Sequence, residues 1–324
     1  MECWFSIVIV VASLLLQAPT DSVRTPAAST GPAREQTAKP QGKLIIPWLE
    51  VNVPLTPVAT RPNVLRRDHC IEGLEHWAKI TDIAIVSTRS GQIDAVYRDI
   101  MRRKPANLHI IGGIKTYSLP GATGNDPRPY DFASPDGWKV IAAQARRIVA
   151  HTGNNVVLLE NETALMPYHL GRESIDHAKL AKSLGALRDT GIEFWWNLPN
   201  VLSDSPKFPN RRKETARLVK TIADALPRSV LLIGYAGRPG WKERTDDRPQ
   251  RRRMMFEIVG KSRLHERVFC TATGRAIGDK RPVYTPAQAI DHAANLPGRL
   301  LIIYPGEAAW VSAGQGFADA AAGP

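Results

Sequence analysis

The segment Asn155–Thr163, which reads NVVLLENET, contains an apolar strand that ends directly at two carboxylates. The run VVLLE at its centre is typical of a strand buried in a sheet. Side chains at positions i and i+2 of a strand share a face, so we expect Glu160 and Glu162 to point the same way. An acidic side chain at the end of a buried parallel strand is where an α/β barrel enzyme holds catalytic groups.

The same kind of short apolar run recurs along the chain, and most of these runs are separated by segments with helical periodicity. We expect eight strands, at Lys43–Val51, Asp82–Ser87, Asn107–Ile114, Asn155–Glu160, Ile192–Asn197, Ser229–Tyr235, Arg267–Thr271 and Arg299–Tyr304. The clearest helices are expected at Gly91–Lys104, Ser134–Gly153, Glu173–Thr190, Asn210–Leu226, Pro249–His265 and Thr285–Leu296.

Start and stop signals agree with several of these helices. Ser134-Pro135 and Thr285-Pro286 read as a cap followed by proline at the first helical position. Gly153 and Gly191 follow the ends of two helical patterns, where a glycine commonly terminates a helix. The turn chemistry therefore supports the alternation of strands and helices.

Eight alternating units predict an α/β protein with a single (β/α)8 TIM-type barrel. No GxGxxG or GxxxxGK[ST] motif follows the first strands, so an open nucleotide-binding sheet is not indicated. A smaller domain or an incomplete barrel is the alternative, since Pro54, Pro57 and Pro62 follow the first strand before any helix. We expect the barrel to span residues 43–312, with a C-terminal tail at 313–324.

The N-terminal residues form a short apolar run from Trp4 to Leu16. This run is short for a membrane span and precedes Ala/Pro/Ser/Thr-rich sequence, which predicts a signal peptide at 1–18. An uncleaved N-terminal anchor is the alternative, because no Lys or Arg precedes the run. Residues 19–42 have the composition of a disordered linker. We therefore expect the protein to be exported to the periplasm or the extracellular space. If the segment is not cleaved, the exported protein would be anchored by its N-terminus.

The chain of 324 residues carries a formal net charge of +12, which suggests affinity for an acidic partner. However, the basic runs Arg211–Lys213 and Arg251–Arg253 open expected helices, and no basic strand interleaved with aromatic residues is present. Nucleic-acid binding is therefore not favoured, whereas an acidic glycan stays open as a substrate.

Cysteine and histidine spacing does not predict a metal or cofactor site. Beyond the N-terminal run, only Cys70 and Cys270 are present, and a disulfide or two buried free thiols are both open. The eight histidines form no HxH or HExxH pattern. We therefore predict neither a metal nor a cofactor.

The strand order and the pair Asn161-Glu162 resemble the retaining, clan A-type barrel glycoside hydrolases. In that group an Asn-Glu pair closes strand four, and its glutamate is the general acid/base. The resemblance implies that Glu162 is the acid and that Asn161 holds a sugar hydroxyl. The nucleophilic glutamate that the group carries after strand seven is not matched here, because that end reads FCTATG at 269–274.

Glycosidic cleavage needs a second carboxylate, as a nucleophile or to activate water. The candidates are Glu307 after strand eight and Glu160 on strand four. A carboxyl separation of about 5 Å would indicate a nucleophile, and one of about 6.5 to 9.5 Å would leave room for a water.

Other side chains expected at the carboxyl ends of strands are suited to binding sugars. Aromatic rings pack on the C–H faces of sugars, and amides or cations bond their hydroxyls. The candidates are Asn197, Trp196, Tyr235, Trp241, Trp310 and Lys115.

Two alternatives to a hydrolase stay open. The first is a non-catalytic barrel that binds glycan, consistent with the unmatched nucleophile. The second is an aldolase or lyase in which Lys115, desolvated at a strand end, forms a Schiff base. Glycan binding without release of reducing ends would indicate the former, and a borohydride-trapped adduct would indicate the latter.

Overall fold

A computed structural model describes residues 44–51, 67–115, 135–160, 175–198, 210–234, 257, 264–269, 285–289, 300–305 and 309–322. The chain divides into two compact units, Met1–Gln41 and Gly42–Pro324, and every described residue belongs to the second unit. The expected signal peptide or anchor at 1–18 and linker at 19–42 lie outside the described residues. Within the described part, no helix has the length and apolar character needed to cross a membrane.

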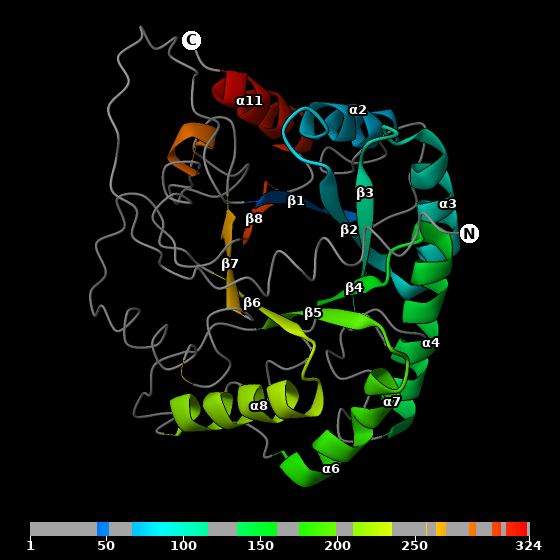
Figure 1. The fold of residues 1–324 in the computed structure, drawn as a ribbon, viewed down its shortest axis with the longest axis vertical. Coiled ribbons are helices and arrows are strands. Elements are labelled where there is room, and N and C mark those ends of the chain that lie inside the picture. The colour runs from blue at the N-terminus through cyan, green and yellow to red at the C-terminus, as the bar shows by residue number, and fades with distance from the viewer. Residues whose placement is uncertain are drawn as a thin grey trace, which may run out of the picture. The chain divides into compact units, whose positions relative to one another are not determined.

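From residue 44 to residue 234, strands and helices alternate along the described residues, as the sequence predicts (Figure 1). The strands are β1 (Leu44–Val51), β2 (Ile83–Arg89), β3 (His109–Lys115), β4 (Val156–Glu160), β5 (Glu193–Leu198), β6 (Val230–Gly234), β7 (Leu264–Phe269) and β8 (Leu300–Tyr304). The helices are α2 (Arg67–Trp77), η1 (Ser90–Gln92), α3 (Ile93–Arg103), α4 (Pro135–Thr152), α6 (His177–Ser183), α7 (Gly185–Arg188), α8 (Arg211–Ala225) and α11 (Trp310–Ala322).

The strands form one parallel sheet in which each strand pairs with the next and β8 pairs with β1, so the sheet closes on itself. Following the paired residues once around the sheet gives a total stagger of eight residues, the shear of an eight-stranded barrel. This arrangement confirms the predicted α/β class and the parallel sheet.

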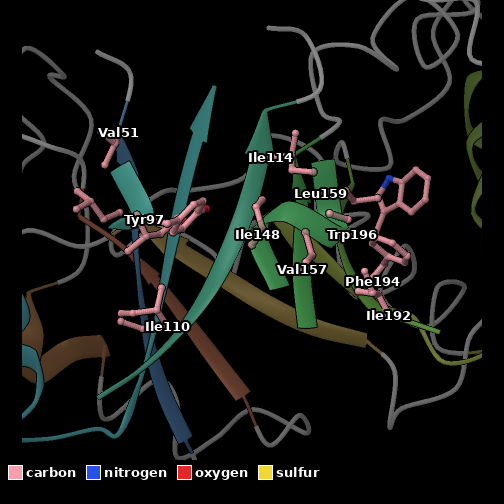
Figure 2. Close-up of a cluster of buried hydrophobic side chains, with 14 of the residues drawn as sticks. Val51, Tyr97, Ile110, Ile114, Ile148, Val157, Leu159, Ile192, Phe194 and Trp196 are labelled. Carbon is pink, nitrogen blue, oxygen red and sulfur yellow. The ribbon is translucent and has the colours of Figure 1, made fainter. Parts of the chain in front are cut away.

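Apolar side chains pack in two layers, one on each face of the sheet. The inner layer, which fills the closed sheet, comprises Ile46, Trp48, Ile85, Ile111, Leu158, Trp195, Val230 and Ile302. The outer layer contains alternate residues of the same strands together with side chains of the helices. Figure 2 shows part of this layer, which includes Val157, Leu159 and Trp196 of the strands and Ile148 of α4. Both faces of a strand are buried in such a sheet, which accounts for the near-continuous apolar runs in the sequence.

The predicted turn chemistry is found at three positions. Gly153 and Gly191 follow α4 and α7 with φ of 67° and 71°, backbone angles that a glycine adopts without strain. Thr285 and Gln288 exchange side-chain to backbone hydrogen bonds of 3.0 and 3.3 Å, which is the reciprocal capping pattern of a helix start. Ser134, the other expected cap, lies outside the described residues.

Three segments differ from the sequence predictions. The chain beyond residue 312, expected to be a tail, continues as α11, because Ala313 and Phe317 are buried in the contact with α2. Strand β7 begins at Leu264, within the segment expected to be helix. Helix α2 was not predicted, although Cys70, Leu74 and Trp77 have the spacing of a buried helical face.

Candidate functional site

The inward-facing positions of the strands change from apolar to polar at the carboxyl end of the sheet. Five strands show the change between one inward position and the next. The pairs are Trp48 to Glu50, Ile85 to Ser87, Leu158 to Glu160, Trp195 to Asn197 and Ile302 to Tyr304. This end of the barrel interior, which we call the polar end, holds the candidate site.

Glu160 is one of the inward-facing residues of the polar end. The sheet register pairs it with Lys115 of β3 on one side and with Asn197 of β5 on the other. Glu160 is 9% exposed and Asn197 is fully buried, so both side chains are largely removed from water. A carboxylate at that depth is costly unless other groups compensate its charge, and Glu160 does interact with other residues. Strand pairing therefore places the Glu160 carboxylate and the Asn197 amide side by side, next to the backbone of Lys115.

Glu50 adds a second carboxylate from β1. It is 8% exposed, lies two residues beyond the inward-facing Trp48, and is paired in register with Ser87 of β2. Strands β1 and β4 are separated by two strands in the closed order. Glu50 and Glu160 therefore enter the barrel from well-separated parts of its wall.

An aromatic pair borders the polar end. The indole Nε1 of Trp48 donates a hydrogen bond of 2.9 Å to Ser87 Oγ. The same indole packs against Tyr304 of β8 with ring centroids 5.3 Å apart and planes inclined by 56°. Trp48, of the apolar interior, is fully buried, and Tyr304, at the polar end of β8, is half-buried, so the pair joins the apolar interior to the polar end.

Among the described residues, a carboxylate with a structural partner lies at the opposite end of the interior. Glu193 opens β5, and its Oε1 accepts a hydrogen bond of 2.7 Å from Trp195 Nε1. Burial raises the pKa of Glu193, and the bond from Trp195 offsets part of that increase. Glu193 is paired with Val156, the first residue of β4, so it lies a full strand length from Glu160.

The structure places the predicted site residues in three groups. Glu160 and Asn197 lie together at the polar end, and the backbone of Lys115 is their neighbour in register. Trp196 and Trp310 lie away from the polar end. The remaining predicted residues lie outside the described part of the chain, and these are Glu162, Glu307, Asn161, Tyr235 and Trp241.

Trp196 does not face the barrel interior. Strand alternation turns it outward, where its ring packs against Trp138 of α4 with centroids 5.4 Å apart, and it is fully buried. The prediction that Trp196 contacts substrate is therefore wrong, because the neighbouring Asn197 takes the inward position.

Trp310 is a core residue between two helices. Its Nε1 donates a hydrogen bond of 3.1 Å to the carbonyl of Cys70, and its ring lies 5.6 Å from that of Trp77. It is fully buried by the contact between α2 and α11. The predicted sugar-binding role of Trp310 is also corrected, because no face of the ring is exposed.

Sequence reasoning missed Glu50, Trp48 and Ser87. Their signal is the two-residue period, since Trp48 and Glu50 share one face of the first strand just as Leu158 and Glu160 share one face of the fourth. Glu50 is a single acidic residue in an apolar strand. It faces the same side of the sheet as Glu160 and lies at the same end of its strand, so the sequence pattern places both at one site.

No cluster of three or more His, Cys, Asp or Glu side chains suited to a metal ion occurs among the described residues. Cys70 is a buried free thiol, and burial raises its pKa to about 12, with a further contribution from the negative charge of Asp99. A thiol with so high a pKa stays protonated and is a poor nucleophile. Cys270 lies outside the described residues.

No protein-family model matches the chain, and no curated protein matches it by sequence. Among solved structures, a GH18 chitinase from Pseudoalteromonas aurantia aligns over 82% of this chain and 97% of its own, with 9% identity and a TM-score of 0.45. A xylose isomerase domain protein from Planctomyces limnophilus aligns over 84% and 94%, with 13% identity and a TM-score of 0.42.

A third solved structure, the orotidine 5'-monophosphate decarboxylase of Methanocaldococcus jannaschii, aligns over 86% of this chain and 98% of its own, with 9% identity and a TM-score of 0.41. The three proteins differ in the activities their names give. Likenesses this weak show no family and assign no function to this chain.

Proposed function

We propose that the chain is a (β/α)8-barrel glycoside hydrolase that cleaves a carbohydrate by carboxylate acid/base catalysis. The observation that supports this most directly is the change of the inward-facing positions from apolar to polar at the carboxyl ends of the strands, with Glu160 among them. Barrel enzymes hold their active sites at this end, on the loops that follow the strands. In the proposal the protein is exported, and its partner is a neutral or acidic glycan.

The proposed acid is Glu162, with Glu160 beside it on the same face of the chain. In this role the Glu162 carboxyl donates a proton to the leaving glycosidic oxygen as the bond to the anomeric carbon breaks. Asn161 and Asn197 supply amide groups for sugar hydroxyls. The second carboxylate that the cleavage requires is Glu160 or Glu307 in this proposal.

Release of reducing sugar from a panel of neutral and acidic polysaccharides tests this proposal. The full chain should release reducing ends from at least one of them, and Glu162→Gln should lower the rate by at least about 100-fold, in line with the loss of general acid catalysis. A matched control is Glu72→Gln, since Glu72 is exposed on α2. Release that Glu162→Gln leaves unchanged would refute the assignment of the acid.

The pairing of Lys115 with Glu160 in register supports one second candidate, a Schiff-base lyase or aldolase. A carboxylate beside the lysine could accept and return the protons that imine chemistry requires. Borohydride in the presence of a carbonyl substrate would then add a permanent mass to Lys115. The glycan-binding alternative predicts oligosaccharide affinity with neither sugar release nor an adduct.

A further inference from the structure

We propose that His177 makes the contact between α6 and α8 sensitive to pH, holding the two helices together near neutral pH and loosening them in mild acid. Helix α6 packs against α8, and His177 is the first residue of α6 (Figure 1). The side chain of His177 is 9% exposed, so its ring is almost wholly enclosed. This regulatory role goes beyond the proposed function and does not depend on it.

The hydrogen bonds of Thr221 in α8 determine which nitrogen of His177 carries the proton. Thr221 Oγ1 lies 2.9 Å from His177 Nδ1, and it donates a hydrogen bond of 2.9 Å to the carbonyl of Arg217. A hydroxyl has a single proton, so an oxygen that donates to Arg217 accepts from the Nδ1–H of His177. The neutral ring therefore carries its proton on Nδ1, and a second proton has to add at Nε2.

The surroundings of Nε2 do not favour a second proton. This nitrogen is buried and has no hydrogen-bond partner. Glu214 Oε2 of α8 lies 3.8 Å from it, which is beyond hydrogen-bonding distance. A positive charge enclosed without a hydrogen bond is costly, so the packed helices favour the neutral ring.

The charged groups around His177 act in the same direction. Burial of the ring lowers the pKa of His177, and the positive charge of Arg217 lowers it further. Glu214 and Asp176, the N-cap of α6, offset only part of this decrease. The neutral form is therefore favoured by the enclosure of the ring and by a cation of the helix against which it packs.

The other charged groups of the packed elements are paired elsewhere or exposed. The lysines of α6 and of α8 are exposed, as is Asp224 of α8. Helices α4 and α7 also pack against α6. Their charged side chains pair with one another, with Asp94 or with Asp189, or are exposed, and these are Asp136, Lys139, Arg146, Arg147 and His151 of α4 and Arg188 of α7.

The sign of the pH response follows from the lowered pKa. Below the ordinary histidine value of about 6.5, the unfolded chain binds more protons at this position than the folded chain does. The contact is therefore fully stabilising above about pH 6.5 and weakens as the pH falls towards the folded pKa. Helices α6 and α7 belong to the crossover from β4 to β5, the strands that carry Glu160 and Asn197 at the polar end.

Amide hydrogen exchange of the full chain, followed by mass spectrometry between pH 7.5 and pH 5.5, tests the inference. Exchange is expressed as a protection factor, which removes the pH dependence of the intrinsic rate. Protection of the α6 amides should fall at least about threefold relative to that of the β3 amides over this range. Strand β3 lies within the closed sheet and reports any general loss of stability in acid.

His177→Asn is the decisive variant. The amide nitrogen of asparagine can take the place of Nδ1 as the donor to Thr221, but asparagine does not titrate. Protection of α6 at pH 7.5 should therefore stay within about twofold of the wild type, and the loss of protection in acid should disappear. The matched control is His69→Asn, an exposed histidine of α2, which should keep the whole response.

Three results would overturn the inference. Protection of α6 that does not change with pH removes the switch, and a pH response that persists in His177→Asn assigns it to other groups. Protection of α6 that increases in acid would mean that Glu214 binds the protonated ring and that the sign is reversed.

Arg217→Gln keeps the inference testable if His177→Asn does not fold. The Arg217 side chain is exposed, and its charge opposes protonation of His177. Loss of that charge should make the fall in α6 protection smaller, and a fall as large as that of the wild type, or larger, would contradict the role given to His177.

Discussion

The backbone amide of Gly113 in β3 donates a hydrogen bond of 2.8 Å to the hydroxyl of Tyr97, a side chain that comes from α3. The same hydroxyl lies 2.6 Å from the carbonyl of Val86 in β2, to which it donates. Tyr97 is fully buried, and burial raises the pKa of its phenol, so the hydroxyl stays protonated and able to donate. A helix side chain thus bridges β2 and β3 just behind Ser87 of the polar end.

Tyr97→Phe is expected to destabilise the fold, because it leaves the Gly113 amide and the Val86 carbonyl without the bridging hydroxyl. A buried polar group deprived of its partner costs about 1–3 kcal/mol in free energy of unfolding. Urea unfolding measures the change. Arg98→Ala, one residue along on the exposed side of α3, is the control, and equal stabilities of the two variants would contradict the bridging role.

Gly113→Ala tests how closely β2, β3 and β4 approach inside the barrel. A Cβ at Gly113 would lie 2.7 Å from Ser87 Cβ and 3.2 Å from Leu158 Cβ. Such overpacking costs about 1–3 kcal/mol. A Cβ at Gly91 would meet no atom within 4 Å, so Gly91→Ala should leave the melting temperature unchanged. Similar melting temperatures for the two alanine variants would show that the strands are less closely spaced.

The sequence predicted the order of strands and helices because each buried strand is apolar on both faces and several helices carry cap signals. It could not tell which face of a strand is inward, and this ambiguity explains the error at Trp196, whose neighbour Asn197 faces the interior. Trp310 was misassigned because it follows the last strand, whereas it begins α11. The contact of α11 with α2 joins segments more than 200 residues apart, and no local pattern reports it.

Trp310 is predicted to matter for stability and not for substrate affinity. Trp310→Ala removes a fully buried indole that packs against Trp77, and a truncation of this kind costs about 3–5 kcal/mol. Trp310→Phe retains most of the packing but loses the hydrogen bond to Cys70, which costs about 1 kcal/mol. Unfolding curves should show this order, and a raised KM in a folded Trp310→Phe variant would contradict the assignment to the core.

Asp94 is expected to make a small contribution to stability that disappears in acid. Hydrogen bonds from Arg147 and then His151 of α4 lower the pKa of Asp94. Because the folded pKa is the lower one, the stabilisation is present above the unfolded value of about 4 and is lost as the pH falls through the folded pKa. Asp94 is 45% exposed, so solvent screening limits the contribution to well under about 1 kcal/mol.

Unfolding of wild type and Asp94→Asn at pH 7 and at pH 3 checks this expectation. The wild type should be slightly more stable at pH 7, and the two curves should converge at low pH. A difference that grows as the pH falls would have the wrong sign for a carboxylate with a lowered pKa.

Two glutamates at opposite ends of the barrel interior test whether its carboxyl end carries out the proposed chemistry. Glu160 ends β4, and Glu193 opens β5 at the other end. On the polysaccharide that the wild type cleaves best, kcat/KM should fall at least 100-fold in Glu160→Gln and less than twofold in Glu193→Gln. A larger loss in Glu193→Gln, or full activity in Glu160→Gln, would contradict a site at the polar end.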